Sequence, residues 1–92
     1  MRITFDLAKR AATLAERRLD FADAAELFAG PHATLADDRI DYGEERLITA
    51  GYLNGRLVVL VSTPRGNARH IISMRHAHGK EERRWIKHFG SD

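Results

Sequence analysis

The residues best suited to chemistry lie within residues 56–75, where an apolar run is followed by a basic turn and then by an alternating segment. Period-two alternation places four residues on one face of an expected strand: Arg69, Ile71, Ser73 and Arg75. Arg65 lies in the turn just before this strand. Arginine suits phosphate binding because its planar guanidinium matches two oxygens and stays charged. We therefore predict a phosphate-binding face here.

Phosphodiester cleavage is the chemistry that such a face suits. Arginines on a rigid sheet can stabilise the charge that develops on a phosphate, and RNA supplies its own nucleophile in the 2′-hydroxyl. The protein then needs a proton acceptor but no metal or cofactor, and the candidate acid–base groups are His70, His76 and Glu45. His70 alternates with Ile72 and Met74, so a structural role in the core and a catalytic role both stay open for it.

Other chemistries have weaker support in the sequence. The chain has no cysteine, which excludes disulfides, thiol nucleophiles and cysteine-based zinc sites. His76, His78 and His88 have no further ligand at a suitable spacing, so we predict no metal site. Glycine-rich phosphate loops are absent, and neither Ser62 nor Ser73 lies at a nucleophile elbow.

Composition predicts one small cytoplasmic domain over residues 1–92, since 43% of the residues are hydrophobic and 30% are charged. We expect no membrane span and no signal peptide, because no apolar run approaches the necessary ~20 residues. Net charge is +2, but residues 65–92 hold seven Lys and Arg against three Asp and Glu. This asymmetry indicates either a polyanionic ligand or a solvated face on the last helix.

Hydrophobic periodicity predicts the elements that position these residues. We expect helices over residues 6–17, 20–30 and 77–89, and strands over residues 34–40, 45–52, 57–61 and 69–75. Asp6 and Asp20 are the expected N-caps, Asn54-Gly55 favours a type I′ turn, and residues 3–5 stay open as an edge strand. The predicted fold is α+β: two N-terminal helices, an antiparallel sheet of about four strands and a C-terminal helix.

Two helical faces carry further predictions. The first helix has a stripe that we expect to be buried, made of Leu7, Ala11, Leu14 and Ala15. The last helix has a basic face made of Lys80, Arg83, Arg84 and Lys87, beside docking residues Trp85, Ile86 and Phe89. The two N-terminal helices have an alanine-rich face and no evident recognition helix, which makes direct DNA binding the weaker interpretation.

Several short motifs, in order along the chain, resemble the BrnT family of bacterial ribonuclease toxins, which has a RelE-like fold. Residues 69–75, with Ala77 after them, are similar to the family's R-x-I-I-S-x-R-x-A signature. The other matching pieces are Phe5-Asp6 with Lys9, Leu19-Asp20-Phe21 with Ala24-Ala25, Gly43-Glu44-Glu45-Arg46, Gly51, residues 57–61, and Thr63 with Arg65.

The resemblance implies an RNA-cleaving toxin that blocks translation and is held inactive, in a heteromeric complex, by a BrnA-type antitoxin. DNA contact would then be indirect, through the antitoxin. Position by position, the resemblance carries over six functional candidates: Lys9, Glu44, Arg46, Arg65, Ser73 and Arg75. Together with the residues above, the predicted catalytic set is Arg65, Ser73, Arg75, Glu44 and His70, and the predicted RNA-binding set is Lys9, Arg46, Arg69, His76, Lys80 and Arg84.

One departure from the family pattern lies between the first two helices. The family commonly has K-H-G there, and this chain has Glu16-Arg17-Arg18. Arg18 would then take the left-handed helix end in place of glycine, at a cost of roughly 1 kcal/mol. The missing histidine also removes an acid–base group or RNA contact. A catalytically silent RNA- or protein-binding module of the same fold is therefore the alternative function. We also expect Arg75→Ala to abolish RNA cleavage and to leave the fold intact, because a polar strand residue on an open face contributes little to the core.

Overall fold

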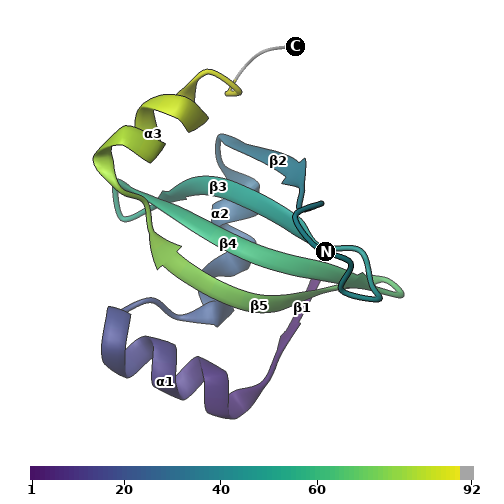
Figure 1. Cartoon of the computed structure of the whole chain (residues 1–92). Coiled ribbons are helices and arrows are strands. Elements are labelled where there is room, and N and C mark those ends of the chain that lie inside the picture. Colours follow the sequence, from purple (N-terminus) through teal and green to yellow (C-terminus); the bar gives the residue numbers. More distant parts are fainter. Residues whose placement is uncertain (90–92) are drawn as a thin grey trace.

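A five-stranded mixed sheet forms the centre of the protein in the computed structural model, which describes residues 1–89 (Figure 1). The strand order is β1-β5-β4-β3-β2. In chain order the elements are β1 (Arg2–Phe5), α1 (Leu7–Arg17), the 3₁₀ turn η1 (Phe21–Asp23), α2 (Ala24–Ala29), β2 (His32–Ala36), β3 (Leu47–Leu53), β4 (Arg56–Arg65), β5 (Ala68–His76) and α3 (Gly79–Ile86).

The sheet corrects the predicted fold class in its details. The prediction of about four antiparallel strands is wrong, because β1 joins the sheet as a fifth strand and runs parallel to β5, with Thr4 opposite His70. Four residues are too few to show a sheet period, and their partner lies more than sixty positions away. The second predicted helix is also divided, into the η1 turn and the short helix α2.

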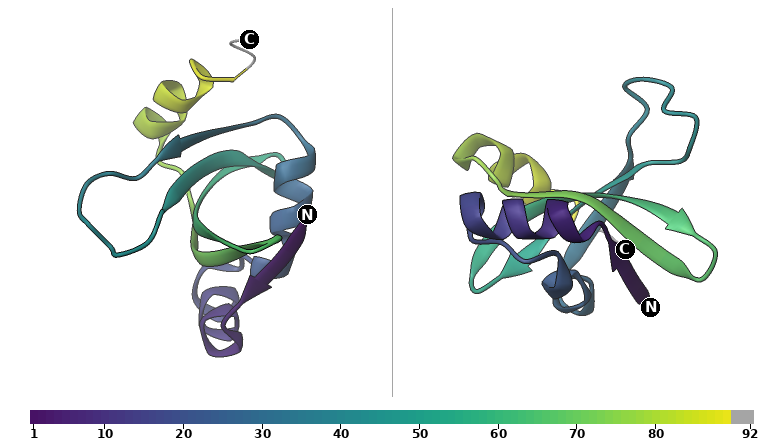
Figure 2. Two further views of the ribbon diagram at one scale, coloured as in Figure 1. Left: turned by 90° about the vertical axis from the view of Figure 1, so that its right-hand side faces the viewer. Right: turned by 90° about the horizontal axis from the view of Figure 1, so that it is seen from below.

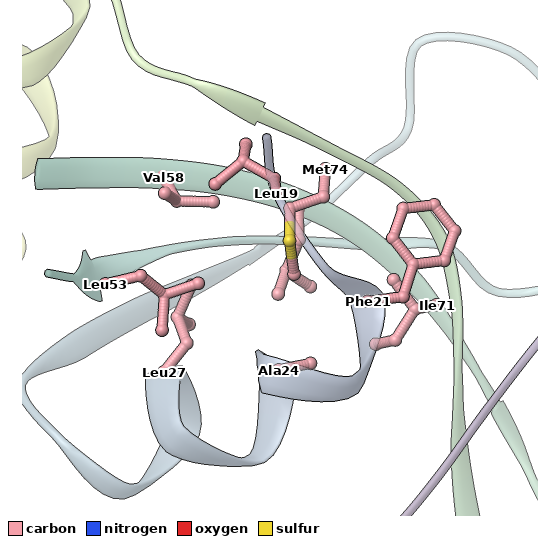
Figure 3. Packing of buried hydrophobic residues seen from close by; sticks show 9 residues of the cluster. Leu19, Phe21, Ala24, Leu27, Leu53, Val58, Ile71 and Met74 are labelled. Carbon is pink, nitrogen blue, oxygen red and sulfur yellow. The ribbon is translucent and has the colours of Figure 1, made fainter. Parts of the chain in front are cut away.

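One face of the sheet is covered by η1 and α2, and this contact forms the first core (Figures 2 and 3). Phe21, Ala24 and Leu27 are buried there against strand residues such as Leu60. Gly51 allows the close approach, since a Cβ at that position would lie 2.7 Å from Leu27 Cδ2. A side chain on β3 would therefore push α2 away from the sheet.

The opposite face of the sheet carries α3, which docks through Trp85. Trp85 packs with Leu57 and Val59 in the second core, and the rings of Tyr52 and Phe89 meet edge to face at 5.8 Å. Because α2 and α3 cover opposite faces, β4 is apolar on both, which confirms the prediction made from its unbroken apolar run.

Local signals for turns and caps are confirmed. Asp6 caps α1, with its Oδ1 accepting from Lys9 N at 2.9 Å, and Asp20 caps η1 through Ala22 N. The Asn54-Gly55 turn has positive φ at both residues, as a type I′ turn requires. Arg18 ends α1 with φ at 56°, in the predicted left-handed conformation.

Candidate functional site

Five of the predicted residues meet in one cleft of about 510 Å³, which we call the Lys9 cleft. Lys9 comes from the first turn of α1, Arg65 from the end of β4 and His70 from β5. Glu44 and Arg46 come from the loop between β2 and β3. Asp6, at the start of α1, also lines the cleft, so three cations, two carboxylates and one imidazole face a common space, brought there by four separate parts of the chain.

His70 is a half-buried residue that lines this cleft. Its Nδ1 lies 2.9 Å from Thr4 Oγ1, a contact that exists because β1 pairs with β5. Burial lowers the pKa of the His70 imidazole below 6.5, and the positive charge of Arg65 lowers it further. The ring is therefore neutral at pH 7, which is the form that can accept a proton.

Asp37 organises the loop that delivers Glu44 and Arg46, and sequence reasoning missed it. Its almost fully buried carboxylate accepts from Arg39 Nε at 2.8 Å and from the Tyr42 hydroxyl at 3.2 Å. The Arg39 hydrogen bond lowers the pKa of Asp37 to about 2. Its backbone N–H also donates to the Arg46 carbonyl at 2.8 Å, which closes the loop. The signal was the charged segment after Ala36, read wrongly as part of a strand.

Arg46 is the arginine of this loop that lines the Lys9 cleft. Its guanidinium lies 3.9 Å from the centre of the Tyr42 ring, in a cation–π contact. Glu44 Oε1 is 3.7 Å from Arg46 Nε, too far for a hydrogen bond. Within the described residues this buried Nε has no hydrogen-bond partner, so Arg46 keeps an unused donor beside the cleft.

Ser73 and Arg75 lie elsewhere, in a second cleft of about 310 Å³ that we call the Arg75 cleft. It is formed beneath α3 and contains Arg39 and Glu81 as well. Arg75 binds Glu81 through two contacts of 2.7 and 2.6 Å, and this pairing lowers the pKa of Glu81 to about 2. Glu81 also accepts from His78 N at 3.2 Å as the capping box of α3. Arg75 thus fastens a helix to the sheet, and the expectation that it lies on an open face of the strand is wrong.

The predicted single face of β5 is wrong as well. Ser73 pairs with Val61 but Ile71 pairs with Ser62, so Ile72 is an extra residue in a β-bulge. The alternation reverses there, and Ile71 and Met74 are buried in the same core although they are three positions apart.

Arg69 therefore separates from Ser73 and Arg75. Its guanidinium lies 5.3 Å from the centre of the Phe28 ring, and its Nη1 donates to Ser62 Oγ at 3.5 Å. It belongs with the first core, on the α2 face.

The remaining candidates stay outside both clefts. Lys80 and Arg84 lie on the basic face of α3, with Arg83 and Lys87, and this helix is shorter than predicted. His76 is at the end of β5, where burial lowers the pKa of its imidazole. Within residues 1–89, no three His, Cys, Asp or Glu side chains gather as a metal site would require. No helix in that range is long and apolar enough to cross a membrane.

The fold and the Lys9 cleft together describe a small α+β protein with a site suited to anions. Residues 5–81 match a family described as the ribonuclease toxin, BrnT, of type II toxin-antitoxin systems. Since the match covers more than half of the chain, this protein belongs to the BrnT family of ribonuclease toxins. An antitoxin is therefore its implied partner. A search of curated proteins gives no match.

Proposed function

We propose that this chain is a metal-independent endoribonuclease whose active site is the Lys9 cleft, and that RNA cleavage there blocks translation. The observation that carries the proposal is the meeting of Lys9, Arg46 and Arg65 with a neutral His70 in one cleft. Cations set around a phosphate stabilise the negative charge of a pentavalent intermediate, and a neutral imidazole accepts the proton of the attacking hydroxyl. A family of ribonuclease toxins is consistent with both roles.

The proposed reaction uses the substrate's own nucleophile. His70 accepts the proton of the 2′-hydroxyl, the 2′-oxygen bonds to phosphorus, and the bond from phosphorus to the 5′-oxygen breaks. Arg65 and Arg46 balance the charge on the phosphate oxygens, and Lys9 is the ammonium available to protonate the leaving oxygen. The products are a 2′,3′-cyclic phosphate and a free 5′-hydroxyl.

The cellular part of the proposal follows from the family. A BrnA-type antitoxin holds the toxin inactive in a heteromeric complex and supplies the contact with DNA. The toxin itself contacts RNA in the cytoplasm. Expression of the chain alone then arrests bacterial growth and bulk translation, and co-expression of its antitoxin restores both.

The decisive test uses a single-stranded RNA of mixed sequence and the same oligonucleotide with 2′-O-methyl groups, both in excess EDTA. We expect the RNA to be cut to cyclic-phosphate ends and the methylated strand to be bound but uncut, because it lacks the nucleophile. Cleavage of the methylated strand would refute the 2′-hydroxyl mechanism. Tight, salt-dependent RNA binding without any cleavage would instead establish the silent binding module.

A further inference from the structure

The helix α1 is amphipathic, but its apolar side faces away from the protein. The side chains that we predicted to be buried are all exposed; this α1 apolar stripe consists of Leu7, Ala11, Leu14 and Ala15. Leu7 is 73% exposed and Leu14 is 44% exposed. No residue of α1 is buried.

Polar contacts hold the other side of α1 against the protein. Arg10 binds Asp20 through two contacts of 2.7 and 3.0 Å, and Arg17 Nη1 donates to the Met74 carbonyl of β5 at 2.9 Å. Arg10 and Thr13 are the helix residues between Leu7 and Arg17 that are half-buried, and both are polar. The orientation of the helix is thus set by hydrogen bonds, while its apolar stripe contacts solvent.

A surface helix ordinarily places its apolar residues inward, since apolar surface exposed to water is unfavourable. An outward stripe of this kind marks a surface that another molecule covers. We propose that the α1 apolar stripe is the docking surface for an amphipathic segment of the antitoxin, with apolar side chains flanked by acidic ones. This inference rests on the antitoxin partner proposed above.

Charge specifies the flanks of that segment. Residues 6–18 carry four cations against two carboxylates, and Arg10 is already paired with Asp20. Lys9 and Arg18 remain exposed at the two ends of the helix. Acidic residues on the partner would pair with these two cations, and basic residues on the partner would be repelled. The charges therefore determine how the bound segment is positioned along α1.

The position of the stripe also accounts for inhibition. A helix of 11 residues is roughly 16 Å long. Stable interfaces bury about 1,200–2,000 Å², so a tightly bound antitoxin must extend beyond α1. Asp6 and Lys9 line the Lys9 cleft at the start of the same helix. A partner that covers the stripe and continues past Lys9 therefore closes the cleft to RNA.

The test measures binding of Leu14→Glu and of a matched control, Leu35→Glu on β2, where the leucine is 43% exposed. The full-length toxin variants and the antitoxin are separated from their co-expressed complexes by denaturant and refolded, and the dissociation constant is measured by calorimetry. We expect Leu14→Glu to weaken binding by about 100-fold or more, as loss of a central contact does, and Leu35→Glu to weaken it less than threefold. Leu7→Glu is a second variant, in case Leu14→Glu does not refold.

Equal loss for the stripe and control variants would overturn the proposal, as would unchanged affinity in both stripe variants. A free toxin dimer that Leu14→Glu dissociates, with antitoxin affinity unchanged, would assign the stripe to a second copy of this chain and also overturn it. Because the readout is binding, a cleft that fails to cut RNA leaves this result interpretable. Closure of the cleft is then tested by asking whether the toxin still binds the uncleavable methylated strand when antitoxin is bound. We expect no binding, and simultaneous binding of strand and antitoxin would refute closure.

Discussion

The Lys9 cleft and the Arg75 cleft both contain arginines, but the two clefts differ in what those arginines contact. In the Arg75 cleft, Arg75 is paired with Glu81 and Arg39 is paired with Asp37. In the Lys9 cleft, three cations face two carboxylates, Asp6 and Glu44, and Glu44 Oε1 lies 3.7 Å from Arg46 Nε, too far for a hydrogen bond. The Arg75 cleft is nearly neutral, and the Lys9 cleft has an excess of positive charge. A guanidinium is available to a phosphate only where no carboxylate already occupies its two donor positions.

The same difference separates structure from chemistry in energetic terms. The Arg75–Glu81 pair joins β5 to the cap of α3, so its main effect is on the stability of the fold. Among the described residues, no ion pair involves Lys9 or Arg65, so these two cations contribute less to folding and are available to a phosphate. We therefore expect substitutions in the Lys9 cleft to reduce activity and substitutions in the Arg75 cleft to reduce stability.

The largest expected effect is that of Arg65→Ala. Removing one group that stabilises the developing charge should lower kcat/KM for RNA cleavage by about 100- to 1,000-fold. The melting temperature should stay within a few degrees of the parent, since Arg65 is exposed at the end of β4. Timed cleavage of a labelled RNA and thermal unfolding together check both parts.

Arg56→Ala is the matched control, because Arg56 is an exposed arginine at the other end of the same strand. It should keep cleavage within about threefold of the parent. A comparable loss of cleavage in both variants would mean that overall positive charge, and not the Lys9 cleft, is responsible for the effect.

The next largest expected effect is the pH dependence of RNA cleavage. Because burial lowers the pKa of His70 below 6.5, the neutral form that we propose as the proton acceptor predominates at pH 7 and is lost as the pH falls through the lowered pKa. Cleavage measured as kcat/KM should therefore fall about tenfold per pH unit on the acidic side, with a midpoint below 6.5.

His70→Asn should cleave RNA slowly, and its pH profile should lack the fall on the acidic side. His76→Asn should retain that fall. His76 is a fair control, since burial lowers the pKa of its imidazole too, but it lies outside the Lys9 cleft. An unchanged fall in His70→Asn would move the proton acceptor to another residue.

Substitutions in the Arg75 cleft should lower the stability of the fold. Loss of the charged hydrogen bonds in Arg75→Ala or Glu81→Gln should cost about 1–2 kcal/mol, which lowers the melting temperature by roughly 5–10 °C in a domain of this size. The pKa of Glu81 is lowered from 4.5 to about 2, so the pair stabilises the fold fully above pH 4.5 and is lost as the pH falls towards 2.

The difference in melting temperature between the parent and Glu81→Gln should consequently shrink over that acidic range. RNA cleavage at 25 °C and pH 7 should change less than threefold in Glu81→Gln. Full stability together with lost cleavage in Arg75→Ala would reverse the assignment of the two clefts.

Sequence patterns predicted the parts of the fold that depend on neighbours in the chain. The cap at Asp6, the type I′ turn at Asn54-Gly55 and the left-handed Arg18 each follow from one or two residues and their own backbone geometry. The buried β4 follows from its unbroken apolar run.

The errors in strand pairing and in which faces are buried involve partners that no local pattern contains. The bulge at Ile72 reverses the faces of β5, so one extra residue separates Arg69 from Arg75. The pairing of β1 with β5 joins segments that lie more than sixty positions apart in the chain. The prediction that the apolar stripe of α1 is buried is wrong, because the folded chain does not supply a surface that would bury it.

For the candidate site, the resemblance to a family named four residues of the Lys9 cleft and the residue types named His70, but only the structure shows which candidates meet. Lys9 and Arg65 are brought together by α1 and β4, and Ser73, named with equal weight, lies elsewhere. Asp37 lies in a charged segment that we predicted to be part of a strand, and its role is to hold Arg39 and Tyr42 rather than to enter the cleft.

The smallest expected effect is a gain in stability from Arg18→Gly. This variant tests whether the end of α1 only supports the Lys9 cleft or takes part in RNA cleavage. Arg18 ends α1 at φ 56°, a conformation in which glycine has no Cβ penalty. The greater freedom of glycine in the unfolded chain offsets part of that gain, so the net stabilisation should be about 0.5 kcal/mol, or roughly 2–4 °C in melting temperature. Lys9 is two turns away and keeps its place in the cleft, so cleavage should be unchanged. Arg17→Ala is the useful comparison, because it removes the hydrogen bond to the Met74 carbonyl and should loosen α1 instead. Altered cleavage in Arg18→Gly, at unchanged stability, would mean that the end of α1 contacts RNA directly, and the active surface would then extend beyond the cleft.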